Sequence, residues 1–131
     1  MISFIKKHWI SILLFIAIAV LCLMSTAPLP KVEVTDFDKL VHLLMFLGVS
    51  GVVFFENTRY FRQRISSRRI FFGSILYPLL FSGAIEIAQE YFTPYRAGDW
   101  MDFLYDGIGV LIGLVICFGI NSKLKYRESA I

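Results

Sequence analysis

Residues 103–120 read FLYDGIGVLIGLVICFGI, and this stretch decides the fold. Asp106 is the only charged residue in it. A helix crosses the hydrocarbon core of a bilayer with about 20 predominantly apolar residues, so the stretch predicts a transmembrane helix. A carboxylate inside such a helix normally faces a bundle interior or a water-filled cavity and indicates a functional site. Partners for Asp106 are therefore expected on other helices.

Three further apolar stretches complete the predicted architecture. The four predicted spans are residues 9–27, 40–55, 70–92 and 103–120. The chain has 131 residues, of which 57% are hydrophobic and only 18% are charged, so little of it remains for a soluble domain. The sequence predicts a single integral membrane domain over residues 1–131, folded as an all-α four-helix bundle.

The distribution of lysine and arginine predicts the orientation. If the N-terminus is cytoplasmic, the outer segments contain only Lys31, Lys39 and Arg96, and the other ten of the 13 basic residues are inside. Cytoplasmic loops favour these residues, so both termini are predicted to be cytoplasmic. The net charge of +3 follows from this topology and indicates no nucleic-acid partner. The arginine-rich segment 59–69 is expected to fix the topology, with binding of anionic lipid or of a partner as the alternative.

The first 27 residues also have features of a signal peptide. Lys6 and Lys7 precede an apolar run that ends near Ser25-Thr26-Ala27. This run of about 16 residues is longer than the roughly 7–15 residues usual in such peptides. We therefore expect an uncleaved membrane anchor.

Polar residues collect where three spans reach the predicted outer face. Asp38 and His42 are four residues apart and share one face of a helix. The last span presents a stripe of Asp99, Asp102, Asp106, Gly109 and Gly113, and the third span presents Ser82, Gly83, Glu86, Gln89 and Glu90. Pro78 is expected to kink the third span below these residues. The inner halves of the spans are expected to contain no charged residue.

The charges in this region do not balance. Asp38, Glu86, Glu90, Asp99, Asp102 and Asp106 face only Lys39, Arg96 and His42. Clustered carboxylates in a poorly hydrated site cannot all ionise without partners. Either some of them are protonated or a cation completes the site. A divalent cation is one solution, with Arg96 binding a phosphate or carboxylate, and the cofactor stays unknown at this point.

Each of these residues also has a structural interpretation. Asp99 and Asp38 suit the N-caps of the last and second spans. His42 alone is more often a structural hydrogen-bonding residue, and Gly109 with Gly113 permits close helix packing. A purely structural polar network is therefore the alternative to a functional site. Asp106 and Glu86 are the hardest to explain this way, because they lie inside apolar spans.

Three motifs carry a resemblance to a known family. They are Asp38-Lys39-Leu40-Val41-His42, Glu86-Ile87-Ala88-Gln89 and Pro94-Tyr95-Arg96, followed by Asp99, Asp102, Asp106, Gly109 and Gly113. In this order, over residues 36–117, they resemble the VanZ-like family of small bacterial membrane proteins, named after an accessory factor for teicoplanin resistance.

The resemblance implies a fold and a compartment but no reaction. The compartment is the bacterial cytoplasmic membrane, with the polar site facing the periplasm or the cell exterior. The implied signature positions are Asp38, Lys39, His42, Glu86, Gln89, Arg96 and Asp102. Asp106 departs from the pattern, which usually has Asn at this position.

Three functions remain open. The first is an enzyme or binding site for a lipid-linked or anionic cell-envelope molecule. Its predicted catalytic residues are His42, Glu86 and Asp102, and its predicted substrate-binding residues are Asp38, Lys39, Gln89, Arg96, Asp99 and Asp106. The second is a non-catalytic accessory protein that binds precursor, antibiotic or partner, which the absence of an activated Ser or Cys nucleophile favours. The third is a small proton-coupled transporter. Whether the chain is an enzyme is left undecided, and membrane lipid is the expected partner.

Overall fold

The computed structural model describes residues 1–24, 35–60, 66–93 and 98–129, with side chains in 1–24, 37–59, 66–93 and 98–123. The described chain is helical and contains no strand, which confirms the all-α prediction. The helices are α1 (Ile2–Lys7), α2 (Trp9–Leu23), α3 (Thr35–Tyr60), α4 (Ser67–Arg69), the π-helix η1 (Ile70–Leu76), α5 (Tyr77–Phe92) and α6 (Trp100–Ser129).

Three of these helical segments are long and apolar enough to cross a membrane. They are Phe37–Arg59, Ser67–Phe92 and Trp100–Lys123. The helix of the first predicted span, α2, has 15 residues, which corresponds to roughly 22 Å at about 1.5 Å per residue. Residues 25–27, the predicted end of that span, lie outside the described residues. The other three predicted spans each lie within one of these helical segments, but α3 and α6 extend beyond the predicted ends in both directions.

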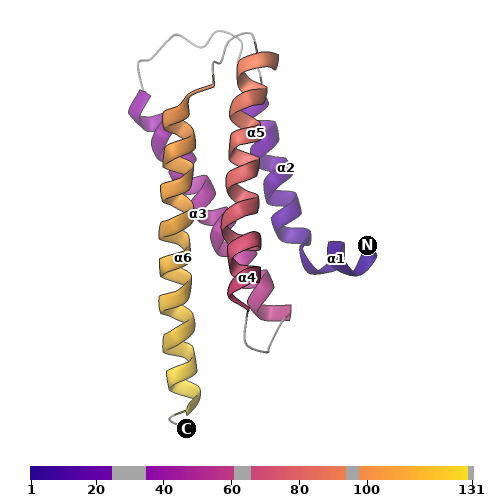
Figure 1. Ribbon diagram of the computed structural model, residues 1–131, viewed down its shortest axis with the longest axis vertical. Helices are drawn as coiled ribbons and strands as arrows, with labels where there is room; N and C mark the ends of the chain where they lie inside the picture. Colours follow the sequence, from indigo (N-terminus) through magenta and orange to yellow (C-terminus); the bar gives the residue numbers. More distant parts are fainter. Residues whose placement is uncertain (25–34, 61–65, 94–97, 130–131) are drawn as a thin grey trace.

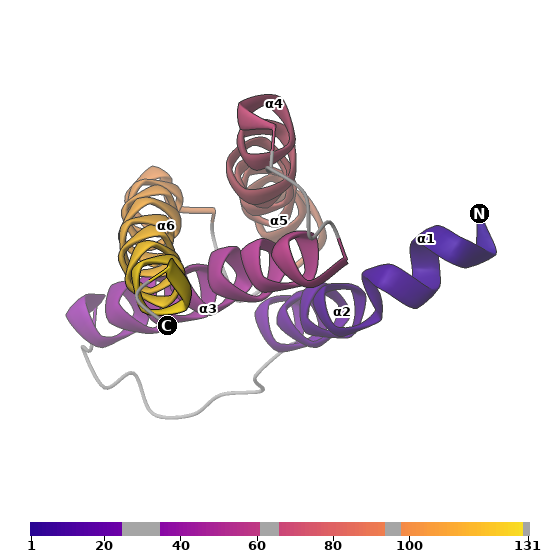
Figure 2. The ribbon, with the colours of Figure 1, turned by 90° about the horizontal axis from the view of Figure 1, so that it is seen from below.

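The four main helices alternate in direction. In Figure 1, α2 and α5 ascend while α3 and α6 descend, so α2 and α5 begin, and α3 and α6 end, toward the lower end, with the start of α2 at about mid-height of the view. We call this the basic end, because Lys6, Lys7, Arg59, Arg68 and Arg69 belong to it. Figure 2 shows α3 passing obliquely beneath α6 and then beside α2, with α5 on the other side. Helix α3 therefore touches every other main helix.

The most extensive packing joins α3 to α6. Two glycines of α6 make it possible, as their spacing predicts. A Cβ atom placed on Gly109 would lie 2.2 Å from the carbonyl oxygen of Leu43, and one on Gly113 would lie 2.7 Å from that of Leu47. Only a residue without a side chain lets the two backbones approach this closely. Nearby, the hydroxyl of Ser50 donates to the carbonyl of Val110 at 3.1 Å.

The backbone before α5 is π-helical instead of α-helical. At its end, the N–H of Tyr77 donates to the carbonyl of Phe72, five residues earlier. Pro78 follows directly, has no N–H to donate, and in an α-helix its ring would press on the carbonyl of Ser74. The wider π turns accommodate that ring, so the predicted interruption at Pro78 takes the form of a π segment.

The glycine crossing yields a matched pair of variants. We expect Gly109→Ala to lower the stability of the folded protein by about 1–3 kcal/mol, since the new Cβ would overlap backbone that cannot move aside. Gly119→Ala is the control, because apart from its neighbours and its own helix backbone no atom of the described residues lies within 4 Å of its Cβ position. Alanine is favoured over glycine in helices by up to about 1 kcal/mol, so the control should be neutral or stabilising. Thermal unfolding in detergent measures both, and equal shifts would contradict the close crossing.

Candidate functional site

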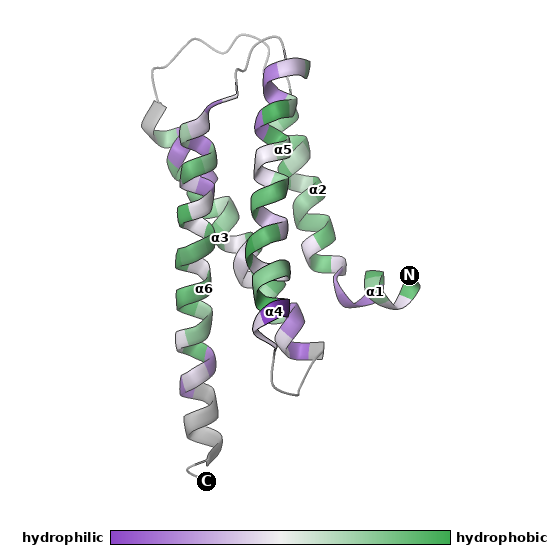
Figure 3. Cartoon of the chain, in the orientation of Figure 1, coloured by the Kyte–Doolittle hydropathy of each residue, from purple (hydrophilic) through white to green (hydrophobic). Residues whose placement is uncertain are grey.

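Three helices bring polar side chains together at the end of the bundle opposite the basic end. His42 comes from α3, Ser82 and Glu86 from α5, and Asp102 and Asp106 from α6, and all five are buried. We call these five residues the polar site. Figure 3 shows hydrophilic residues near the upper ends of these helices, above their mainly hydrophobic middle parts. Ser82 with Glu86, and Asp102 with Asp106, are each four residues apart, so each pair shares one helix face.

Asp106 is the centre of the polar site. Its Oδ1 lies 3.1 Å from Nδ1 of His42, and its Oδ2 accepts a short hydrogen bond from the hydroxyl of Ser82. Asp106 is only 1% exposed and His42 only 2%. When Asp106 is ionised its carboxylate can only accept, and the Nδ1–H of His42 is then the donor in this pair. The carboxylate thereby holds the orientation of the imidazole ring.

The other ring nitrogen of His42 faces a second carboxylate. Its Nε2 lies 3.9 Å from Oδ2 of Asp102, which is longer than a hydrogen bond. Asp38 lies one helical turn before His42 on α3 and is half-buried. The imidazole of His42 therefore has carboxylates near both of its nitrogens.

Glu86 links the polar site to the start of α6. Its Oε2 accepts a hydrogen bond from the backbone N–H of Asp99 at 2.8 Å. Its Oε1 is buried and has no hydrogen-bond partner among the residues with described side chains. A buried carboxylate oxygen without a partner is costly, so this atom is the feature of the site that most requires a ligand.

The segment before α6 is fastened to α5 by two glutamates. Glu90, one turn after Glu86, accepts from the backbone N–H of Gly98 at 3.0 Å. A Cβ on Gly98 would lie 2.4 Å from the carbonyl oxygen of Glu86, so only glycine allows this approach. The hydrogen bonds of Glu86 to Asp99 and of Glu90 to Gly98 position the start of α6, and with it Asp102 and Asp106.

The remaining predicted site residues have different positions. Asp99 is exposed, and its Oδ1 accepts from the N–H of Met101 at 2.8 Å, the geometry of an N-cap. Gln89 is buried and donates from Nε2 to the carbonyl of Cys22 at 3.0 Å, which ties α5 to the end of α2. Lys39 is half-buried, one residue after Asp38. Arg96 lies outside the described residues.

Two overlapping triplets have the composition of a metal site. One is Asp38, His42 and Asp102, and the other is His42, Glu86 and Asp106, with one ligand atom from each residue lying within 4.8 Å of the others. Adjacent ligands bonded at about 2.1 Å lie roughly 3–4 Å apart, so a small contraction would suffice. Imidazole together with carboxylates suits Mn²⁺, Fe²⁺ or Zn²⁺ better than Mg²⁺.

A second polar cluster lies at the basic end and was not predicted. Glu56 is 1% exposed and accepts from the N–H of Ile10 at 3.0 Å and from the hydroxyl of Ser11 at 2.6 Å. Nδ1 of His8 lies 3.4 Å from the same carboxylate. The expectation that no charged residue lies in the inner halves of the spans is therefore wrong. The second span was predicted to end at residue 55, whereas α3 continues through Tyr60 and carries Glu56 into the bundle.

The Asp106 contacts make a prediction about stability. Asp106→Leu removes both acceptors and leaves the Ser82 hydroxyl and a His42 nitrogen buried without partners, at about 1–3 kcal/mol for each group. Asp106→Asn keeps an amide oxygen that accepts from Ser82, so we expect a clearly smaller loss. Thermal unfolding of the two variants in detergent tests this. Equal stability of the Leu variant and the wild-type protein would show that Asp106 does not hold these groups.

Comparison with known proteins adds the family to this geometry. Residues 2–121, which is nearly the whole chain, match the VanZ/LLP1 family. The match extends well beyond residues 36–117, the region in which the motifs were found, and includes α1 and α2. Comparisons with curated proteins and with solved structures each found no match. The extent of the family match and the apolar helices of spanning length lead to one conclusion: the chain is a membrane protein that belongs to the VanZ/LLP1 family.

Proposed function

We propose that the polar site binds the phosphate of a lipid-linked cell-envelope molecule through a divalent cation. The observation that carries this proposal is the buried Oε1 of Glu86, which has no hydrogen-bond partner among the described side chains and belongs to a residue grouped with His42 and Asp106 in a candidate metal triplet. A metal ion would give this oxygen a ligand bond and would draw the surrounding carboxylates together.

The charges of the site favour a cation-bridged ligand over a bare anion. Glu86, Asp102 and Asp106 are buried together, Asp38 is adjacent, and His42 is the only potential cation among the five residues of the polar site. A phosphate alone would be repelled by this set of carboxylates. A divalent ion held by one or more carboxylates commonly retains positions for phosphate oxygens, so it can join the two. Lys39 and Arg96 are proposed to contact the same ligand.

The depth of the site suits a lipid headgroup. Glu86 is six residues from the end of α5, and Asp102 is in the first turn of α6, so both lie near one end of helices of spanning length. The excess of basic residues at the other end supports a cytoplasmic location for that end and an external location for the polar site. A ligand that moves within the outer leaflet of the bacterial cytoplasmic membrane would reach the site from the side.

The same residues suit a hydrolytic step on the bound phosphate. In this step His42 would be the general base and not a metal ligand, with Asp106 orienting its ring through Nδ1, while Glu86 and Asp102 would hold the cation. Nε2 of His42 would take a proton from the water that attacks phosphorus, the bond from phosphorus to the lipid oxygen would break, and the lipid alcohol would leave with that proton. Asp102 near Nε2 would orient the attacking water or the metal ion. Ser82 is not the nucleophile in this proposal, because its hydroxyl donates to Asp106 and not to His42.

The pairing of the Ser82 hydroxyl with Asp106, and not with His42, also favours a second candidate function. Without a nucleophile paired to a base, the site could bind its ligand and release it unchanged, as an accessory protein would. Phosphate release from a bound lipid phosphate distinguishes the two, because the enzyme produces inorganic phosphate and the accessory protein does not. His42→Ala should abolish that release while the protein stays folded.

Binding itself is tested with Mn²⁺ and a polyprenyl phosphate. Native mass spectrometry of the purified protein should detect the lipid only when Mn²⁺ is present, and a chelator should remove it. We expect Glu86→Gln to weaken this binding by about 10–100-fold, the loss usual for a group that supports a metal site.

Glu90→Gln is the matched control for this experiment. Glu90 is exposed and makes the same kind of backbone contact one turn away, to Gly98 instead of Asp99. The control should bind Mn²⁺ and lipid as the wild-type protein does. Metal-independent binding of the lipid, or equal weakening by the two variants, would overturn the proposal.

A further inference from the structure

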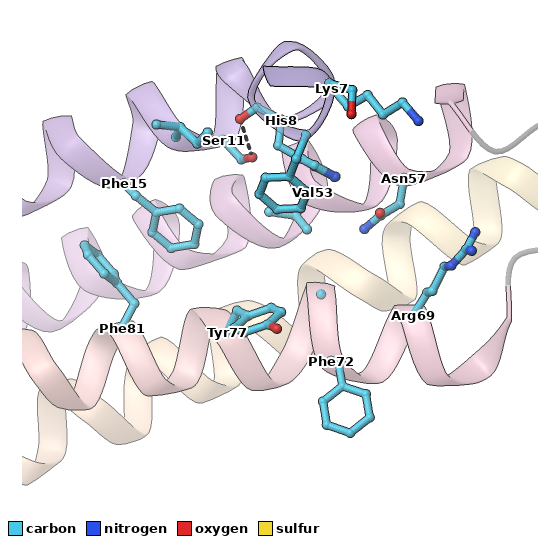
Figure 4. A pocket seen from close by; sticks show the side chains of 14 residues that line it. Lys7, His8, Ser11, Phe15, Val53, Asn57, Arg69, Phe72, Tyr77 and Phe81 are labelled. Carbon is cyan, nitrogen blue, oxygen red and sulfur yellow. Dashed lines mark hydrogen bonds between the residues drawn. The ribbon is translucent and has the colours of Figure 1, made fainter. Parts of the chain in front are cut away.

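A cavity lies at the basic end, remote from the polar site. Its volume is about 580 Å³, within the roughly 300–1,000 Å³ typical of ligand pockets. The walls come from α1 and α2, from α3, and from α4, η1 and α5. Figure 4 shows the side chains that converge on it.

The two ends of the cavity differ in chemistry. In Figure 4, Phe15 and Phe81 lie at one end, while Lys7, Asn57 and Arg69 lie at the other. Phe15 and Phe81 pack edge to face, with ring centroids 4.6 Å apart. A long apolar region with cations at one mouth matches a molecule that has an apolar chain and an anionic head.

We propose that this cavity binds an anionic membrane phospholipid, with an acyl chain among the aromatic side chains and the phosphate at Lys7 and Arg69. Lys7 and Arg69 already have interactions within the chain, so the phosphate is an additional partner. An ammonium group offers three N–H donors and a guanidinium offers five, which leaves donors for it.

The acidic residue Glu56 lies beside the cavity, because its carboxylate contacts the lining residues Ser11 and His8. The Glu56 carboxylate accepts from the backbone N–H of Ile10 and from the hydroxyl of Ser11, and it lies beside His8. The N-terminus of α2 therefore stabilises its negative charge, which reduces the repulsion of an anion in the cavity. Charge complementarity therefore selects an anionic lipid over a zwitterionic one.

The arrangement of α1 supports a lipid as the occupant. In Figure 1, α1 points away from the bundle at the foot of α2, and its side chains Ile2, Phe4 and Ile5 are exposed. A short helix with exposed apolar residues and two lysines suits the boundary between membrane and water. Because Phe4 and Lys7 of α1 also line the cavity, its mouth would lie at headgroup level. An apolar cavity at this depth is a poor site for water but a good one for an acyl chain.

The test compares two lipids that differ only in headgroup. The full-length protein, stripped of lipid in detergent, is titrated with palmitoyl-oleoyl phosphatidylglycerol or with the phosphatidylcholine of the same chains. Native mass spectrometry measures the bound lipid. We expect phosphatidylglycerol to bind on the order of tenfold more tightly, as two cations beside one anionic head imply.

Two pairs of variants locate the binding site. Ile12→Trp fills the cavity and should abolish binding of both lipids, whereas Leu13→Trp, at an exposed neighbouring position that does not line it, should not. The double variant Lys7→Gln with Arg69→Gln should still bind the acyl chains of both lipids but should lose the preference for phosphatidylglycerol. Lys6→Gln with Arg68→Gln removes the same charge beside the cavity and should retain the preference.

Several results would overturn this proposal. They are equal binding of the two lipids to the wild-type protein, equal effects of the two tryptophan variants, or equal effects of the two charge pairs. If Ile12→Trp fails to fold, the charge pairs decide the matter alone. No residue of the polar site is changed, so a failure here would leave the cation-bridged binding at Glu86 unaffected.

Discussion

The close crossing of α3 and α6 is the constraint on which the rest of the structure depends. Gly109 meets the carbonyl of Leu43, which directly follows His42, and Gly109 lies three residues after Asp106. The backbone contact thus lies within one turn of the pair formed by His42 and Asp106. Any residue larger than glycine would separate the helices and move the imidazole away from its carboxylate. Packing and the geometry of the site are therefore determined by the same contact.

The polar site is informative because it is buried among apolar helices, where charged side chains are costly. Buried carboxylates and an imidazole are expensive inside a membrane helix bundle unless they satisfy one another or bind a ligand. Asp106 is fully engaged by His42 and Ser82, and one oxygen of Glu86 is engaged by the backbone of Asp99. The other oxygen of Glu86 is not. This imbalance is the observation on which the proposed binding of a ligand rests.

The two ends of the bundle use buried carboxylates in different ways. At the basic end, Glu56 has donors for both oxygens and anchors the start of α2 to α3, which is a structural role. At the other end, Glu86 has a donor among the described residues for one oxygen only. Two buried glutamates thus differ in how many of their oxygens have hydrogen-bond donors among the described residues, and the proposed function relies on this difference.

The sequence predicted what helical periodicity controls. Asp38 with His42, Asp102 with Asp106, and Gly109 with Gly113 were placed on common faces, and these faces meet in the structure. Gln89 shows the limit of such reasoning. It was grouped with Glu86, yet it donates to α2, because the neighbours of α5 on each side depend on packing that periodicity does not encode.

The structural role of Glu56 was missed for a related reason. The end of a span was assigned where apolar residues stop, whereas α3 continues past this point and buries Glu56 against the start of α2. A helix N-terminus can satisfy a carboxylate from another helix, so an acidic residue near the end of an apolar span need not mark the membrane boundary.

The most direct test of this account is a double-mutant cycle between His42 and Asp106. Unfolding of the wild-type protein, His42→Leu, Asp106→Leu and the double variant would be measured under one set of conditions. If α6 presents Asp106 to His42 as described, the two substitutions should be coupled by about 1–3 kcal/mol, with the double variant losing much less stability than the sum. Additive losses, within about 0.5 kcal/mol, would show that the two residues do not interact and would contradict the account.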